Sequence, residues 1–270
     1  MEDFTISEGE FAELGYCHIP QFVPPVLLNE WADDLHWLVA TQLKRFGLAA
    51  SEESDPVRRL SRSLIALWRA KPEAQSWIYE EVNRRPWMFE LASSRLLTSW
   101  VMEVLGSERI AIHPRLLMII SMPGHEWNVA YWHQDRFYGP HVHVVAYIPL
   151  QNTGAFNGGL MVAPGEHKRG LMPHAHNEAL SGKNKWITLP PEVIASFKEQ
   201  RQLELMAGDL VLFDGLLPHS ANLNCSEDVR FAVALRYTDL TDPFFIERGW
   251  RWEDLAEEGR RALARKENAP

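Results

Sequence analysis

Three side chains in the second half of the chain could together bind a transition metal. His133 and Asp135 stand two positions apart in a segment typical of a β-strand, and His219 follows the strand-like run 210–214. Because alternate residues of a strand share a face, His133 and Asp135 can reach one ion, and His219 could return from the opposite side of a barrel. Two imidazoles and one carboxylate occupy one face of an octahedral ion and leave three positions open. This pattern favours a reactive metal centre over a closed structural zinc site.

A second pair of histidines offers a competing ligand set. His141 and His143 also stand two positions apart and could form an all-histidine site of the cupin type. Their neighbours Pro140 and Val142 begin a strand that we expect beside the ligand strand. A histidine near a barrel mouth is more often hydrogen-bonded than metal-bound, so we favour the mixed set of ligands.

The elements that must position these ligands are short strands. After Gly106 the sequence consists of runs rich in Ile, Val, Leu, Phe and Tyr, separated by turns that contain Gly or Pro. The expected strands are 115–121, 130–135, 142–150, 160–163, 203–206, 210–214 and 231–238. Many short strands with such turns are typical of a barrel or jelly roll. We therefore predict an α+β fold with a double-stranded β-helix core, which is jelly-roll and cupin-like.

The first part of the chain has a different periodicity. Between Pro24 and Gly106 apolar residues recur at helical spacing, and Pro24 and Gly47 fit a helix start and a helix stop. We expect one domain over 1–270. Its mainly helical portion, 1–106, packs as a layer on a jelly-roll core, 107–240, and a C-terminal helix lies within 241–270.

A polar tract interrupts the strand series at 173–202. We interpret it as an insertion that carries a helix near 191–200 and lies over the barrel mouth. Long ordered loops in compact domains are usually functional, so this insertion could act as a mobile lid. A solvated insertion without such a role is the alternative.

Composition excludes several other classes of protein. The formal net charge of -9, with no concentrated basic patch, argues against a nucleic-acid or anionic membrane partner. The 2 cysteines, Cys17 and Cys225, are far apart and exclude a disulfide framework. The sequence from Met1 to Phe4 lacks a secretory signal, and no apolar run is long enough to span a membrane. We expect a cytoplasmic protein with a small-molecule substrate; the sequence gives no indication of its oligomeric state.

Several short motifs together identify a family resemblance. The segments that carry it are His133-Gln134-Asp135, Asn157-Gly158-Gly159, Pro164-Gly165-Glu166-His167, Gly208-Asp209 and His219. In order and spacing, from about residue 115 to residue 237, they resemble the phytanoyl-CoA dioxygenase family. The resemblance implies that His133, Asp135 and His219 bind Fe(II), with 2-oxoglutarate and O2 as co-substrates.

The resemblance also assigns a clamp for 2-oxoglutarate. In this family an arginine eleven positions beyond the distal histidine pairs with the C5 carboxylate, and that position here is Arg230. A planar guanidinium can grip a carboxylate through two parallel hydrogen bonds, which suits the task. Gln134 and Tyr147 resemble further co-substrate contacts.

The implied activity is hydroxylation of a small molecule, with 2-oxoglutarate converted to succinate and CO2. Related halogenases lack the carboxylate ligand, so the presence of Asp135 favours hydroxylation, with desaturation and ring formation still open. One alternative is a non-catalytic jelly roll that binds zinc or nickel as a sensor or for structure. The other is a cupin-type enzyme that does not use 2-oxoglutarate and leaves Arg230 without a task.

Overall fold

The computed structural model describes residues 8–114, 116–126, 129–139, 141–176 and 187–250. Its α-helices are α1 (Glu8–Leu14), α2 (Pro25–Arg45), α3 (Pro56–Ala70), α4 (Ala74–Val82), α5 (Pro86–Ala92), α6 (Arg95–Leu105), α7 (Asp135–Tyr138), α8 (Pro191–Ala195) and α9 (Pro243–Glu247). Two 3-10 turns lie at Ala155–Asn157 and Glu166–Arg169. None of the described helices is long and apolar enough to cross a membrane.

Local signals fix where the longer helices begin and end. Helix α2 starts after Pro24, and α3 starts after its N-cap Asp55, whose carboxylate accepts a hydrogen bond from the Arg58 amide at 2.8 Å. Gly106 ends α6 in the left-handed conformation (φ 60°), where a residue with a Cβ would be strained. The buried residues of α2 recur every three or four positions: Leu28, Trp31, Ala32, Leu35, Val39 and Leu43. This stripe directs the helix onto the sheet.

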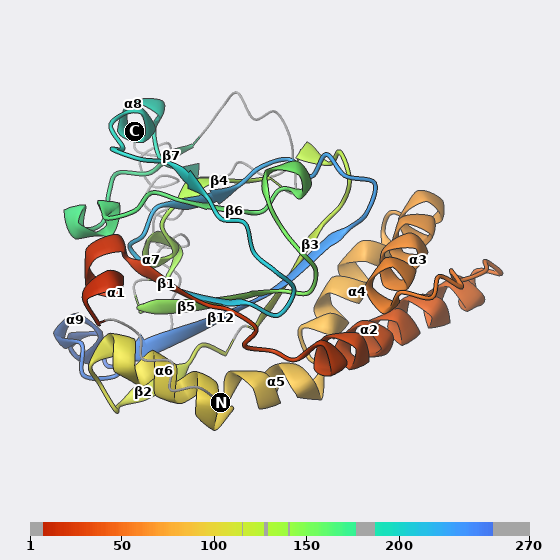
Figure 1. The fold of residues 1–270 in the computed structure, drawn as a ribbon, viewed down its shortest axis with the longest axis horizontal. Helices are drawn as coiled ribbons and strands as arrows, with labels where there is room; N and C mark the ends of the chain where they lie inside the picture. Colours follow the sequence, from red (N-terminus) through yellow and green to blue (C-terminus); the bar gives the residue numbers. More distant parts are fainter. Residues whose placement is uncertain (1–7, 115, 127–128, 140, 177–186, 251–270) are drawn as a thin grey trace, which may run out of the picture.

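The larger of two antiparallel sheets contains six strands. They are β1 (Tyr16–Ile19), β2 (Ile110–Ile112), β3 (Leu117–Ser121), β5 (Val144–Pro149), β10 (Leu210–Asp214) and β12 (Arg230–Asp239). The order is β1-β10-β5-β12-β2, and β3 pairs with the first half of β12, beside β2. Helices α2 to α6 lie along one face of this sheet (Figure 1).

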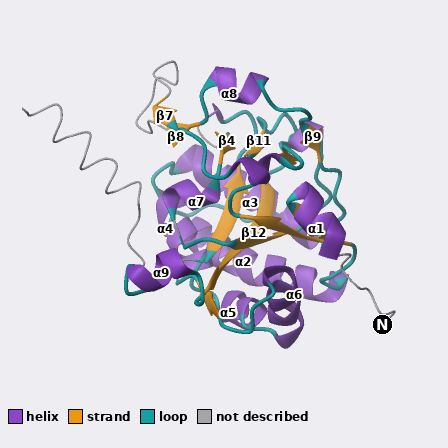
Figure 2. Ribbon diagram, turned by 90° about the vertical axis from the view of Figure 1, so that its left-hand side faces the viewer, coloured by secondary structure: helices purple, strands orange, loops and turns teal. Residues whose placement is uncertain are grey.

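In Figure 2 the smaller sheet, with β4, β11 and β9 labelled, lies on one side of β12, and α2, α5 and α6 lie on the other. Its order is β4-β11-β6-β9, from β4 (Ala130–His133), β11 (His219–Ala221), β6 (Leu160–Val162) and β9 (Arg201–Gln202). A separate two-stranded pair joins β7 (Ala175–His176) to β8 (Ile187–Thr188). The two larger sheets face each other, which is the layered arrangement of a jelly roll.

Strand β12 separates two hydrophobic cores because its side chains alternate. Phe231, Val233, Leu235 and Tyr237 pack in the cluster that includes α2 to α6. The alanines Ala232 and Ala234 face a second cluster between the sheets. Small residues on this inner face leave room inside the barrel for the longer side chains at its two ends, Arg230 and Arg236.

The structure departs from the strand and helix predictions in several places. The strand predicted at 203–206 is displaced to Arg201–Gln202, and only Leu205 makes an isolated bridge, to Thr153. The helix predicted near 191–200 ends at Ala195. The sequence analysis missed β1 and β2, which are short strands at the sheet edges. Of the portion 241–270, expected to carry a C-terminal helix, residues 251–270 lie outside the described residues, and the described part contains the short helix α9.

Candidate active site

The predicted metal ligands come from two adjacent strands and the turn that follows one of them. His133 ends β4 and lies directly opposite His219 of β11 in the antiparallel register. The prediction that His219 returns from the opposite side of the barrel is wrong, because β11 is the immediate neighbour of β4. Asp135 is also not on the strand as predicted: Gln134 stays extended, and Asp135 is the first residue of α7.

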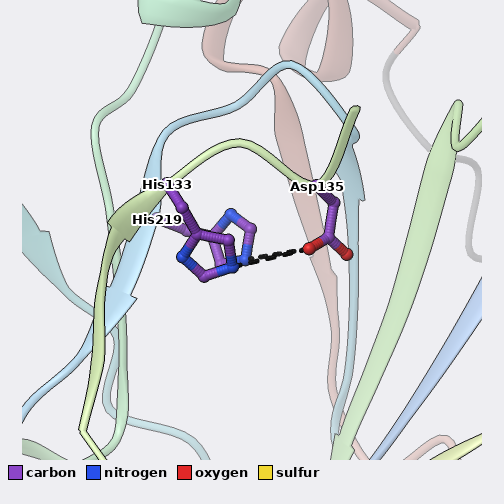
Figure 3. A group of neighbouring side chains, drawn as sticks. All are labelled: His133, Asp135 and His219. Carbon is purple, nitrogen blue, oxygen red and sulfur yellow. Dashed lines mark ion pairs between the residues drawn. The ribbon is translucent and has the colours of Figure 1, made fainter. Parts of the chain in front are cut away.

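The three side chains nevertheless converge (Figure 3). The distance from Asp135 Oδ1 to Nε2 is 3.5 Å for His133 and 3.9 Å for His219, and one ligand atom from each residue lies within 4.8 Å of the other two. Ligands at right angles, each about 2.1 Å from an ion, are themselves about 3 Å apart. The observed spacing therefore fits three ligands on one face of a single ion. Within the described part of the chain, no other group of His, Cys, Asp and Glu has this geometry.

Both histidines are held in the tautomer that a metal needs. His133 Nδ1 lies 2.7 Å from the Tyr131 carbonyl, and His219 Nδ1 lies 3.0 Å from the Leu217 carbonyl. A carbonyl can only accept, so each Nδ1 carries the proton and donates it. Each Nε2 then presents its lone pair toward Asp135, which is the usual arrangement of a metal-binding imidazole.

The charges of the site suit metal binding as well. Burial alone would raise the pKa of Asp135, but the positive charge of Arg236 holds that pKa well below its ordinary value. Burial, aided by His133, lowers the pKa of His219 to about 3. At neutral pH the site therefore offers a carboxylate and neutral imidazole, the protonation states that bind metal.

Arg230 lies inside the barrel at the start of β12. Its side chain is among the largest fully buried ones, and its Nη1 donates to the Tyr147 hydroxyl at 3.0 Å. Its Nε has no hydrogen-bond partner, and no carboxylate among the described residues forms an ion pair with it. A buried, unpaired guanidinium is costly unless an anion joins it, so the geometry fits a site that receives a carboxylate.

Gln134 is fully buried, and its side chain is committed to the main chain. Its Nε2 donates to the carbonyls of Gly170 (2.9 Å) and Leu216 (2.6 Å), and its Oε1 accepts from the Met172 amide (2.8 Å). These bonds occupy both ends of the side-chain amide, and the contact with 2-oxoglutarate expected of Gln134 stays a prediction. Gln134 instead joins the turn between the first two ligands to the loop that precedes His219.

Two residues at the site were missed by the sequence analysis. Arg236 Nε donates to Asp135 Oδ2 at 2.8 Å. His174, within the insertion expected at 173–202, accepts a hydrogen bond from the main-chain amide of Gln134 at 3.1 Å and stacks on Phe137 at a ring separation of 4.0 Å. Strand alternation offered one signal: Arg236 shares the inner face of β12 with Arg230.

The competing pair of histidines does not form a metal site. His143 Nε2 lies 2.9 Å from the carboxylate of Asp242, which also pairs with Arg136 at 3.1 Å. His141 is buried and stacks on His113, with ring centroids 5.1 Å apart. Neither histidine belongs to the ligand cluster, so the all-histidine alternative loses its structural basis.

The second half of the polar insertion contacts β4, the strand that carries His133. Thr188 Oγ1 and the Leu189 amide both donate to the Trp132 carbonyl at 2.8 Å, and the Trp132 ring packs against Phe197. Residues 177–186, the central part of the insertion expected at 173–202, lie outside the described residues. The lid therefore stays a prediction.

Comparison with known proteins identifies the family. Residues 11–232 match the family model described as "Phytanoyl-CoA dioxygenase (PhyH)". The chain belongs to the phytanoyl-CoA dioxygenase family. The human peroxisomal phytanoyl-CoA dioxygenase is 22% identical over 94% of the chain and 74% of its own length. A probable phytanoyl-CoA dioxygenase of Caenorhabditis elegans is 27% identical over 64% of the chain, and the match spans only 58% of that relative.

Solved structures support the fold. The epimerase SnoN from nogalamycin biosynthesis, in complex with Fe3+ and alpha ketoglutarate, has a TM-score of 0.53 at 19% identity over 87% of this chain and 82% of its own. The carbocyclase SnoK has a TM-score of 0.54 at 17% identity and covers 91% of each chain. The predicted family, the α+β jelly-roll fold, and the iron and 2-oxoglutarate dependent oxygenase class are thereby confirmed. So are Fe(II), 2-oxoglutarate and O2 as cofactor and co-substrates.

Proposed function

We propose that this enzyme hydroxylates a small-molecule metabolite, with Fe(II) bound by His133, Asp135 and His219. The observation that carries the proposal is the combination of this triad with the buried guanidinium of Arg230, which has no carboxylate partner among the described residues. The triad leaves one face of the ion for 2-oxoglutarate and O2. Arg230, with Tyr147 beside it, supplies the cation and hydrogen bonds for the C5 carboxylate.

The bound iron would supply the oxidising chemistry, and the residues around it would hold and isolate the reactants. Arg230 and Tyr147 orient 2-oxoglutarate from inside the barrel. Gln134 and His174 hold the turn between the first two ligands, so that the ligands are positioned before the metal arrives. We do not assign a co-substrate contact to Gln134.

The type of reaction and the substrate are the parts that the family leaves open. SnoN is described as an epimerase and SnoK as a carbocyclase, so one fold and cofactor set serve several outcomes. The carboxylate of Asp135 occupies the position that a halide takes in related halogenases, which supports hydroxylation. We propose a small molecule as substrate and the cytoplasm as location.

A two-part experiment tests this function. The metal-free protein is titrated anaerobically with Fe(II) and 2-oxoglutarate, and a metal-to-ligand charge-transfer band is expected in the visible spectrum. Exposure to O2 should then release succinate, even when a substrate panel contains no true substrate. A protein that binds Fe(II) but gives neither band nor succinate is a metal sensor or a cupin-type enzyme, and the proposal is then wrong.

A further inference from the structure

We infer that Arg236 is a positioning residue that keeps Asp135 bound to the metal through a single oxygen and so preserves an open coordination position. The inference rests on the proposed function, because it concerns how this site accommodates iron with 2-oxoglutarate. Arg236 is outside the ligand triad and outside the arginine clamp that the family pattern predicts.

The two oxygens of Asp135 have different partners. Oδ1 faces Nε2 of both histidines, at 3.5 Å from His133 and 3.9 Å from His219. Oδ2 points away from them (Figure 3) and accepts from Arg236 Nε at 2.8 Å. The carboxylate is therefore already divided into one oxygen for the metal and one for the guanidinium.

Because Asp135 is buried, the hydrogen bond to its Oδ2 depends on Arg236. The Asp135 side chain is 4% exposed, so water is largely excluded from Oδ2. Among the described residues, Arg236 is the one donor that bonds to this oxygen. Without it, Oδ2 would remain buried and without a donor, which is costly for a charged oxygen. A bound cation within reach would then be the most favourable partner for Oδ2.

Binding of Asp135 through one oxygen matters because the metal has a limited number of coordination positions. Two imidazoles and one carboxylate oxygen use three positions of an octahedral ion, which leaves two for chelating 2-oxoglutarate and one for O2. If Asp135 bound through both oxygens, it would occupy one of those three. A carboxylate can bind in either manner, so a hydrogen bond to its second oxygen can decide between them.

The position of Arg236 on β12 fits this role. It lies six residues after Arg230, and because strand side chains alternate, both arginines point to the inner face. A guanidinium stays charged at any pH at which the enzyme works, so it holds Oδ2 permanently.

The chain contains a matched control. Arg136 is adjacent to Asp135 in sequence, and its side chain is 23% exposed, against 21% for Arg236. Arg136 also pairs with an aspartate, but that partner is Asp242, which is not in the ligand cluster. Replacing Arg136 removes a similar ion pair near the site without changing the partner of Oδ2.

The test compares R236M, R236Q and R236K with R136M and the wild type. Neither methionine nor the shorter glutamine can donate to Oδ2 in the way arginine does, whereas lysine can. The first measurement is the crystal structure of each Co(II) and 2-oxoglutarate complex, which shows how many oxygens of Asp135 contact the metal. The second is the dissociation constant of Co(II), and the third is succinate release with Fe(II) and without substrate.

We expect Asp135 to contact the metal through both oxygens in R236M and R236Q, and through one in the wild type, R236K and R136M. Metal affinity should change by about 10- to 100-fold in R236M and R236Q, in line with other partners of metal ligands. Succinate release should fall at least about tenfold in these two variants and stay within about threefold in R236K and R136M.

A single-oxygen contact and unchanged succinate release in R236M or R236Q overturn the inference. If R236M does not fold, as thermal unfolding of the metal-free protein would show, R236Q gives the same answer. Failure of the proposed function would be detected by a different measurement. The wild type would then lack the charge-transfer band with Fe(II) and 2-oxoglutarate, whereas the Co(II) crystals report only how Asp135 binds the metal.

Discussion

His133 and His219 face each other across the paired strands β4 and β11, at the same position of the register, with ring centroids 4.2 Å apart. Strand pairing therefore positions two ligands at once, and the third follows from the turn after β4. A single shift of register would move His219 to the other face of its strand and disassemble the site. The irregularity in the β11 pairing lies just beyond His219, so it leaves this pair intact.

The first prediction concerns these histidines. H133A and H219A should each lower Fe(II)-dependent succinate release by at least about 1,000-fold, because two ligands alone do not hold the ion in place. The matched control is H143A, which removes the histidine that pairs with Asp242 instead of the ligand cluster. H143A should bind Co(II) with an affinity within about threefold of wild type, measured by calorimetry. Strong loss of metal in H143A alone would restore the all-histidine alternative.

The second prediction is that Arg230 affects stability and co-substrate binding in opposite directions. R230M should raise the KM for 2-oxoglutarate at least about 30-fold, because a lost buried charge pair costs on the order of 2–5 kcal/mol. The same change should stabilise the metal-free protein by on the order of 1 kcal/mol, since it removes a buried guanidinium that has no acidic partner among the described residues. Urea unfolding without ligands measures this second effect.

The variant Y147F is the control for R230M. It removes the hydroxyl that accepts from Arg230 but leaves the charge in place. The KM for 2-oxoglutarate should rise only about three- to tenfold, because the charge of Arg230 remains available to the carboxylate. An unchanged KM in R230M would show that the C5 carboxylate lies elsewhere, whereas the dissociation constant of Co(II) should be nearly the same in all three proteins.

Short sequence motifs predicted those site residues that lie close together in the sequence or at a fixed distance from a motif residue. Ligand types and family motifs predicted His133, Asp135 and His219, which the structure brings together, and the family spacing predicted Arg230, eleven positions after His219. The location of Asp135 on a strand was wrong, yet the site prediction did not depend on it. Gln134 is still extended, so the side chains on either side of it point the same way.

The partners of these residues could not be predicted because they come from distant segments. Arg236 lies 101 residues from Asp135, and the Gln134 side chain bonds to main-chain groups 36 to 82 residues away. No local pattern encodes such contacts, and a glutamine between two metal ligands resembles a co-substrate contact. Strand β1 was missed for a similar reason: its four residues become a strand by pairing with β10.

The third prediction concerns Gln134. Q134A should lower the free energy of unfolding by on the order of 2–4 kcal/mol, because three main-chain groups, of which the Met172 amide is buried, lose their partner. Metal affinity should fall at least about tenfold, since the two loops that carry the ligands are no longer joined. The KM for 2-oxoglutarate should change far less than in R230M. A large rise of that KM at unchanged stability would instead support the original interpretation of Gln134 as a co-substrate contact.

The last prediction is that the metal-free protein loses stability as the pH falls below about 6.5. Burial lowers the pKa of His141 from 6.5 to about 4, with His113 and His143 contributing, and burial lowers the pKa of His174 to the same value. Each pKa is lower in the folded than in the unfolded protein, so the unfolded chain binds more protons between the two values. The stability that depends on neutral His141 and His174 is complete above pH 6.5 and is lost as the pH falls toward 4. Between about pH 7 and pH 5 the wild type should lose on the order of 4 kcal/mol in urea unfolding, and H141L, which cannot titrate at this position, should lose about 2 kcal/mol less. An identical pH dependence in H141L and wild type would mean that His141 is protonated without cost and that its burial does not oppose the charge.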